Sequence, residues 1–184
     1  MDLFLKDRQN DRTFIIAAWM NRCSDSLAER EQAKRQLCHA LERQWRNRVH
    51  HLLLTPLQYS FSHLAGQTWA VSTSQEWCVG IDAACNEEFS QPYPVEKVFH
   101  PQELSILEPA QVWSAKEAVV KAIGCGFDGM NPLDIRLTDA SSATVAKRGI
   151  GSGLPTSFHL WSWRLVDRGW VTVAYQRNFR LLRC

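Results

Sequence analysis

The sequence predicts an α+β protein built as a pseudo-dimer: two similar α/β halves with antiparallel sheets and the active site at their interface. A helix followed by strands occurs twice along the chain, in an N-terminal half (residues 1–80) and a C-terminal half (residues 81–184). With 184 residues, 45% of them hydrophobic, the chain can bury a substantial core. The pseudo-dimer rests on the order of the elements, because no repeat is visible residue by residue.

The first half begins with a helix and continues with three strands. Ser24 or Asp25 can cap a helix that runs to about Arg46, because apolar residues recur there at near-helical spacing. Three strand-like segments follow, with turns at Ala65-Gly66 and near Gln75-Glu76: residues 59–63, 69–73 and 77–82.

The segment 77–82 alternates between apolar and other residues, as a half-buried strand does. Asp82 lies on the face opposite the apolar residues, together with Cys78 and Gly80. We therefore expect Asp82 to end a strand. The end of a strand is a rigid place to mount a ligand.

The second half repeats the plan of helix and then strands. It contains a helix from Glu108 to Ile123, a strand near 134–137, a Gly/Ser-rich loop over 140–155 and a hairpin of 157–165 with 170–175. The segment Gly124–Gly129 satisfies G-x-G-x-x-G, but it follows a helix instead of a strand. We interpret Gly124 as the C-cap of that helix instead of a dinucleotide fingerprint.

The second-half helix presents a charged side and an apolar side. At about 100° per residue, Glu117 and Lys121 fall opposite the apolar stripe, with Trp113 and Lys116 near them. One carboxylate and two ammonium groups are thus expected to project together. Such a group suits a divalent metal beside a phosphorylated ligand.

Composition excludes several classes of function. The 21 basic and 19 acidic residues nearly balance, which argues against a nucleic-acid binder. The best apolar stretch, Thr13–Trp19, is too short to span a membrane, and no signal peptide is visible. Six cysteines without C-x-x-C spacing indicate reduced thiols and a cytoplasmic protein.

Four motifs occur in a fixed order, although each is unremarkable alone. Glu117 and Lys121, for example, also form an ordinary i, i+4 pair. The motifs are S-F-S-H-L (60–64), V-G-I-D (79–82), F-H-P-Q-E (99–103) and W-S-A-K-E-A-V-V-K (113–121). Their order resembles the 4′-phosphopantetheinyl transferase superfamily, specifically its surfactin-type branch.

The resemblance implies a transferase that moves 4′-phosphopantetheine from coenzyme A to a serine of an acyl or peptidyl carrier protein and releases 3′,5′-ADP. Such carriers serve fatty acid, polyketide or nonribosomal peptide biosynthesis. The resemblance implies a monomer that needs Mg²⁺, with Mn²⁺ as an alternative. Magnesium favours one or two carboxylates together with phosphate oxygens.

The resemblance also assigns roles to individual residues. It places the metal on Asp82 and Glu117 and makes Glu117 and Lys121 catalytic. Glu117, or a metal-bound water beside it, would accept the serine proton, and Lys121 would hold phosphate oxygens or the departing group. His63 and Arg35 would meet the 3′-phosphate end of coenzyme A. The expected coenzyme A site as a whole comprises Arg35, Ser62, His63, Asp82, Lys116 and Lys121.

One position departs from the family pattern. Surfactin-type members read G-I-D-x-E, whereas this chain has Ala84 where the second acid of the metal site stands. A water can replace the missing oxygen, or Glu87 or Glu88 can bend back toward the metal. The alternatives to a working transferase are a degenerate module that binds coenzyme A or a carrier without transfer, and an enzyme redirected to another coenzyme A thioester.

The carrier-docking surface is harder to place. Few residues separate Glu103 from Trp113, where the family commonly has a longer helical excursion. Carrier proteins are acidic, so a basic or apolar groove is expected to face them. Lys97, Lys116 and the face formed by residues 118–120 are the candidates for it.

Overall fold

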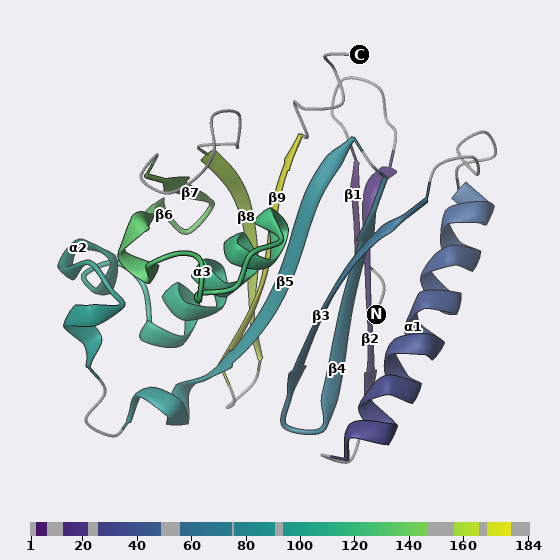
Figure 1. The fold of residues 1–184 in the computed structure, drawn as a ribbon, viewed down its shortest axis with the longest axis horizontal. Coiled ribbons are helices and arrows are strands. Elements are labelled where there is room, and N and C mark those ends of the chain that lie inside the picture. Colours follow the sequence, from purple (N-terminus) through teal and green to yellow (C-terminus); the bar gives the residue numbers. More distant parts are fainter. Residues whose placement is uncertain are drawn as a thin grey trace.

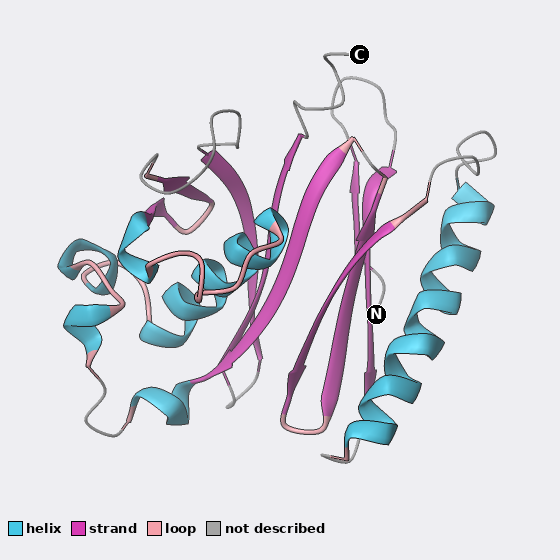
Figure 2. Cartoon of the chain, viewed as in Figure 1, coloured by secondary structure: helices cyan, strands magenta, loops and turns pink. Residues whose placement is uncertain are grey.

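The computed structural model describes residues 3–6, 13–21, 26–48, 56–74, 76–90, 94–146, 157–165 and 169–177. The fold is α+β, with two antiparallel sheets, as the sequence predicts (Figures 1 and 2). From right to left, Figure 1 shows α1, the first sheet and the second sheet, with α3 overlapping the second sheet in this view. No helix in these ranges is both long and apolar enough to cross a membrane.

The first sheet has the strand order β1-β2-β4-β3. Its strands are β1 (Leu3–Lys6), β2 (Thr13–Asn21), β3 (Gln58–Leu64) and β4 (Gln67–Thr73). The β3–β4 hairpin turns at Ala65-Gly66, as predicted, and both residues have positive φ angles, of 47° and 74°. Such angles suit a tight hairpin turn, and at the second position glycine adopts them without strain.

The helix α1 (Leu27–Arg48) packs on one face of the first sheet. The cap is Ser26, whose Oγ accepts a hydrogen bond from the backbone N–H of Glu29 at 3.3 Å. The expected caps, Ser24 and Asp25, lie outside the described residues. The buried stripe of the helix packs against Ala70 and consists of Ala33, Leu37, Leu41 and Trp45.

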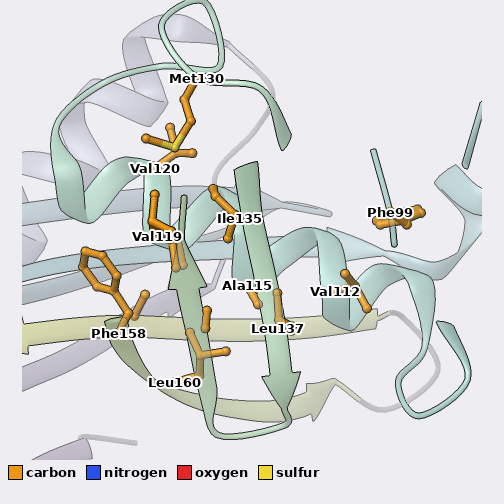
Figure 3. Packing of buried hydrophobic residues seen from close by; sticks show 14 residues of the cluster. Phe99, Val112, Ala115, Val119, Val120, Met130, Ile135, Leu137, Phe158 and Leu160 are labelled. Carbon is orange, nitrogen blue, oxygen red and sulfur yellow. The ribbon is translucent and has the colours of Figure 1, made fainter. Parts of the chain in front are cut away.

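The second sheet has the order β5-β9-β8-β7-β6. Its strands are β5 (Trp77–Cys85), β6 (Ile135–Asp139), β7 (Ser142–Val145), β8 (Ser157–Leu165) and β9 (Gly169–Arg177). The helix α3 (Pro109–Ile123) covers one face and ends at Gly124 in the left-handed conformation, as predicted. Val119 of α3 and Phe158 of β8 belong to the core beneath it (Figure 3).

Short helices connect β5 to α3 and α3 to β6. They are η1 (Asn86–Phe89), η2 (Val95–Lys97), α2 (Pro101–Leu104) and η3 (Pro132–Asp134). Phe99, between η2 and α2, is buried against α3 in the same core as Val112. In the segment between Glu103 and Trp113, Leu104 and Leu107 are partly buried against the same core, whereas Ile106 is exposed.

The two sheets pack against each other through their inner faces. Trp69 and Val71 of β4 lie in one buried cluster with Ile81 of β5 and Val173 of β9. At one side of this interface the edge strand β3 of the first sheet lies beside the edge strand β5 of the second (Figure 1). We call this meeting of two edges the β3–β5 seam.

Three details differ from the sequence-based expectations. The strand β5 continues to Cys85, so Asp82 lies inside a strand and does not end it. Its last residues are held by pairing with β9, from Ala83 opposite Val171 to Cys85 opposite Gly169. The expected loop 140–155 contains β7, and the segments β1 and β2 were not predicted as strands.

Candidate functional site

Asp82 lies in the middle of the seam, almost completely buried. Its Oδ1 accepts hydrogen bonds from Lys121 Nζ at 2.7 Å and from Ser62 Oγ at 2.9 Å. Burial raises the pKa of Asp82, and the Lys121 charge, these two hydrogen bonds and the Ala83 N–H oppose the rise. The buried carboxylate of β5 is thus held by one side chain from β3 and one from α3.

The close approach of α3 to β5 depends on Gly80. A Cβ at this position would lie 2.0 Å from the carbonyl oxygen of Ala118 and 2.6 Å from the backbone nitrogen of Ala122. Only glycine permits this distance, and Gly80 lies on the same face of β5 as Asp82. Gly80 in the motif V-G-I-D therefore sets the distance between α3 and β5, and with it the distance between Lys121 and Asp82.

Glu117 and Lys121 extend from α3 toward Asp82. Burial raises the pKa of Glu117, the negative charge of Asp82 adds to that rise, and the Lys121 charge lowers it. The charge of Asp82 therefore acts on the Glu117 carboxylate. With one ammonium between them the two carboxylates carry a net charge of about −1 when ionised, which a cation would neutralise.

This pair of acids fits a magnesium ion, which favours one or two protein carboxylates with water or phosphate as its other ligands. Within the described residues no group of three or more His, Cys, Asp or Glu side chains could hold a metal. Ala84 is buried opposite Trp170. Glu88 accepts a hydrogen bond from the Cys85 N–H at 3.4 Å and Glu87 is exposed, so neither supports the alternative in which one bends back.

Charged side chains also surround His63, which lies on the face of β3 that packs with α1. Phe61, two residues before it, packs with α1, whereas Ser60 and Ser62 face β5. The Nδ1 of His63 lies 2.9 Å from Thr68 Oγ1, and its buried Nε2 has no hydrogen-bond partner among the described residues. Such an unsatisfied buried nitrogen is uncommon in proteins and calls for an explanation.

The pKa of His63 is shifted by burial and by the charges around the ring. Burial lowers this pKa first, and the charges of Lys34, Arg30 and Lys121 lower it further, while Glu31 raises it. The charges of three cations and one carboxylate thus act on the imidazole, so the charge around His63 is net positive.

A model of the 4′-phosphopantetheinyl transferase superfamily matches residues 78–175 of the chain. The match covers more than half of the protein and includes Asp82, Glu117 and Lys121. The chain belongs to the 4′-phosphopantetheinyl transferase superfamily. No curated protein matches the chain.

Arg35, which the resemblance places at the 3′-phosphate end of coenzyme A, stays a prediction in that role. It is exposed on α1 and interacts electrostatically with Glu31, whereas Lys34 and Arg30 face His63. Lys34 Nζ lies 5.9 Å from the centre of the Phe61 ring and 2.7 Å from Glu31 Oε1. Sequence analysis missed Lys34 and Arg30, although their i, i+4 spacing places both on one flank of α1.

The placement of Lys116 beside Glu117 and Lys121 is wrong. Lys116 and Glu103 are both 0% exposed and form an ion pair at 2.9 Å. Lys116 Nζ also donates to the carbonyl oxygens of Val98 at 2.9 Å and Pro132 at 3.0 Å, so its three protons are used. Burial lowers the pKa of Lys116, and Glu103 opposes that change.

This ion pair gives the transferase-family motif F-x-x-x-E a structural role. Glu103 also accepts hydrogen bonds from the backbone N–H groups of His100 and Leu137, both at 2.8 Å. It therefore ties α2, α3 and β6 together. The expected docking face at residues 118–120 is wrong as well, because these residues of α3 are buried in the core between the helix and the second sheet.

Proposed function

We propose that the protein transfers 4′-phosphopantetheine from coenzyme A to a serine of an apo acyl or peptidyl carrier protein, with Mg²⁺ or Mn²⁺ bound, and releases 3′,5′-ADP. The observation that carries the proposal is the approach of Glu117 on α3 to Asp82 on β5, within a superfamily match that covers both. Two acids brought together in a phosphopantetheinyl transferase fold support metal-assisted chemistry on a diphosphate.

In the proposed reaction the serine oxygen forms a bond to the phosphorus that carries pantetheine. The bond between that phosphorus and the bridging oxygen breaks, and 3′,5′-ADP leaves with the electron pair. Glu117 accepts the serine proton, since burial raises its pKa and makes it a better base than an exposed carboxylate. A bound metal would neutralise charge on the diphosphate, and Asp82 with Glu117 would hold it.

We assign the 3′-phosphate end of coenzyme A to the group around His63, with Lys34 and Arg30. The unsatisfied Nε2 of His63 can donate to a phosphate oxygen when it carries the ring proton and Nδ1 accepts from Thr68, and the two cations add attraction. Arg35, expected at this end from the sequence, is exposed on the same helix and stays a candidate beside them. We further propose that the two helix-and-sheet units are the halves of a pseudo-dimer with the site at their interface.

A second candidate is a degenerate module that binds coenzyme A or a carrier protein without transfer. Ala84 favours it, because a metal at Asp82 and Glu117 would have only two protein carboxylates within the described residues. Water can complete such a site, so we place catalysis first. That the protein is a monomer and is cytoplasmic is an expectation from the sequence.

The test is transfer to a panel of apo carrier proteins in the presence of coenzyme A and magnesium. Mass spectrometry should show the gain of one phosphopantetheine group per carrier by the wild type. Glu117→Gln should lose the activity by 100-fold or more while keeping the wild-type melting temperature, since general-base catalysis alone contributes about 10²–10⁴-fold. Glu96→Gln, which removes an exposed carboxylate, is the matched control.

Two results would contradict the proposal in different ways. Transfer by Glu117→Gln at the wild-type rate would remove Glu117 from the reaction. Tight binding of coenzyme A by the wild type, with no transfer to any carrier of the panel, would support the binding module instead.

A further inference from the structure

The β3–β5 seam is closed by side chains, not by backbone pairing. Each strand is the edge of its own sheet, and an edge strand carries N–H and C=O groups that need partners. On β5 the N–H of Ile81 donates to Ser60 Oγ and that of Ala83 donates to Ser62 Oγ, both at 3.1 Å. Two serine hydroxyls thus take the place of the carbonyl groups that a continuous sheet would supply.

Lys121 donates hydrogen bonds to carbonyl groups on both strands of the same seam. Its Nζ donates to the carbonyl oxygens of Phe61 on β3 at 3.1 Å and of Ile81 on β5 at 3.2 Å, besides Asp82 Oδ1 at 2.7 Å. An ammonium group has three protons, and these three bonds use all of them. Lys121 therefore has no donor left for a phosphate oxygen in this arrangement.

Ser62 differs from Ser60 in one respect. Both hydroxyls accept a backbone N–H of β5, but Ser62 also donates its own proton to Asp82 Oδ1 at 2.9 Å. The one proton of the Ser62 hydroxyl is thereby used within the protein, as the three protons of the Lys121 ammonium group are. Both hydrogen bonds end on the same oxygen of Asp82, and its second oxygen, Oδ2, receives neither.

We propose that Ser62 is a positioning residue for Asp82, not a contact for coenzyme A. With Lys121 it fixes Oδ1 of Asp82 and so turns Oδ2 toward the ligand. The proposal rests on the proposed function in one respect, that Asp82 is a metal ligand. Groups that orient a metal ligand commonly change metal affinity by 10–100-fold when they are removed.

The two serines provide a matched pair of variants. Ser60→Ala and Ser62→Ala each remove one hydroxyl that accepts a β5 N–H at 3.1 Å, so both should lower the melting temperature, and Ser62→Ala should lower it more because it also loses the hydrogen bond to Asp82. Only Ser62→Ala should also weaken Mn²⁺ binding, by 10-fold or more, measured by electron paramagnetic resonance without coenzyme A. The KM for coenzyme A at saturating Mn²⁺ should stay within about two-fold of the wild type for both.

The outcomes separate this proposal from the proposed function. If Ser62→Ala binds Mn²⁺ as Ser60→Ala does, or raises the KM for coenzyme A at saturating Mn²⁺, Ser62 does not act through Asp82. If the wild type binds no Mn²⁺, the proposed function fails at its metal site. Ser62→Thr keeps the hydroxyl and should recover the Mn²⁺ affinity that Ser62→Ala loses, which a loss of stability alone would not explain.

Discussion

Replacing Gly80 by alanine would force α3 away from β5. The added Cβ would lie 2.0 Å from the Ala118 oxygen and 2.6 Å from the Ala122 nitrogen. Both are backbone atoms, so no side chain can rotate to make room. The helix must move by about 1.4 Å to bring the shorter contact to the 3.4 Å at which ordinary contact begins. That shift breaks the 2.7 Å bond from Lys121 to Asp82.

The expected loss for Gly80→Ala is about 3 kcal/mol, at the upper end of overpacking in a core. For a chain of this length, this corresponds to a melting temperature lower by roughly 6–12 °C. Urea denaturation gives the free energy of unfolding and a thermal scan gives the melting temperature. The variant should also bind Mn²⁺ more weakly, because α3 carries Glu117 away from the β5 aspartate.

Gly126→Ala is the control for Gly80→Ala. A Cβ at position 126 would meet no atom closer than 3.7 Å, and its backbone does not require glycine. Its free energy of unfolding should change by no more than about 0.5 kcal/mol. Equal urea midpoints for the wild type and Gly80→Ala would refute the argument that α3 is in contact with β5 at this point.

Two further predictions concern buried titratable groups. The lowered pKa of His63 keeps the ring neutral in the folded chain at pH values where the unfolded chain, with an ordinary value of 6.5, binds a proton. The free energy of unfolding should therefore fall as the pH drops below about 6.5, and urea titrations of His63→Gln should lack this component. Lys116→Met should cost about 3–5 kcal/mol, because it leaves the Glu103 carboxylate buried without its cation. Adding Glu103→Gln should recover part of this loss in the same urea assay, and a double variant less stable than Lys116→Met would contradict the ion-pair argument.

The sequence predicted those elements whose hydrophobic period is clear. The helices α1 and α3 and the strands β3, β4, β5, β8 and β9 lie within a few residues of the expected ranges. The turn at Ala65-Gly66 and the cap at Gly124 follow from local backbone preferences and were predicted for that reason. The strand β7 was missed because it is only four residues long and lies in a Gly/Ser-rich segment.

The errors at the site come from tertiary contacts. A helical projection places Lys116 about 100° from Glu117, and this angle does not reveal that Glu103 lies buried beside Lys116. The alternation of Ser60 and Ser62 along β3 does not reveal what this side of the strand faces. In the structure that side faces a second sheet, and both serines are buried.

The seam explains why polar groups of this kind can be buried at all. A carboxylate and an ammonium group inside a protein are costly unless each is paired and hydrogen-bonded. Here the open edges of β3 and β5 supply the partners, since their unpaired backbone groups bond Ser62 and Lys121, which in turn hold Asp82. A continuous sheet would have used these backbone groups itself and left no place for the aspartate. The break between the two sheets is therefore what allows a charged site in the interior of the molecule.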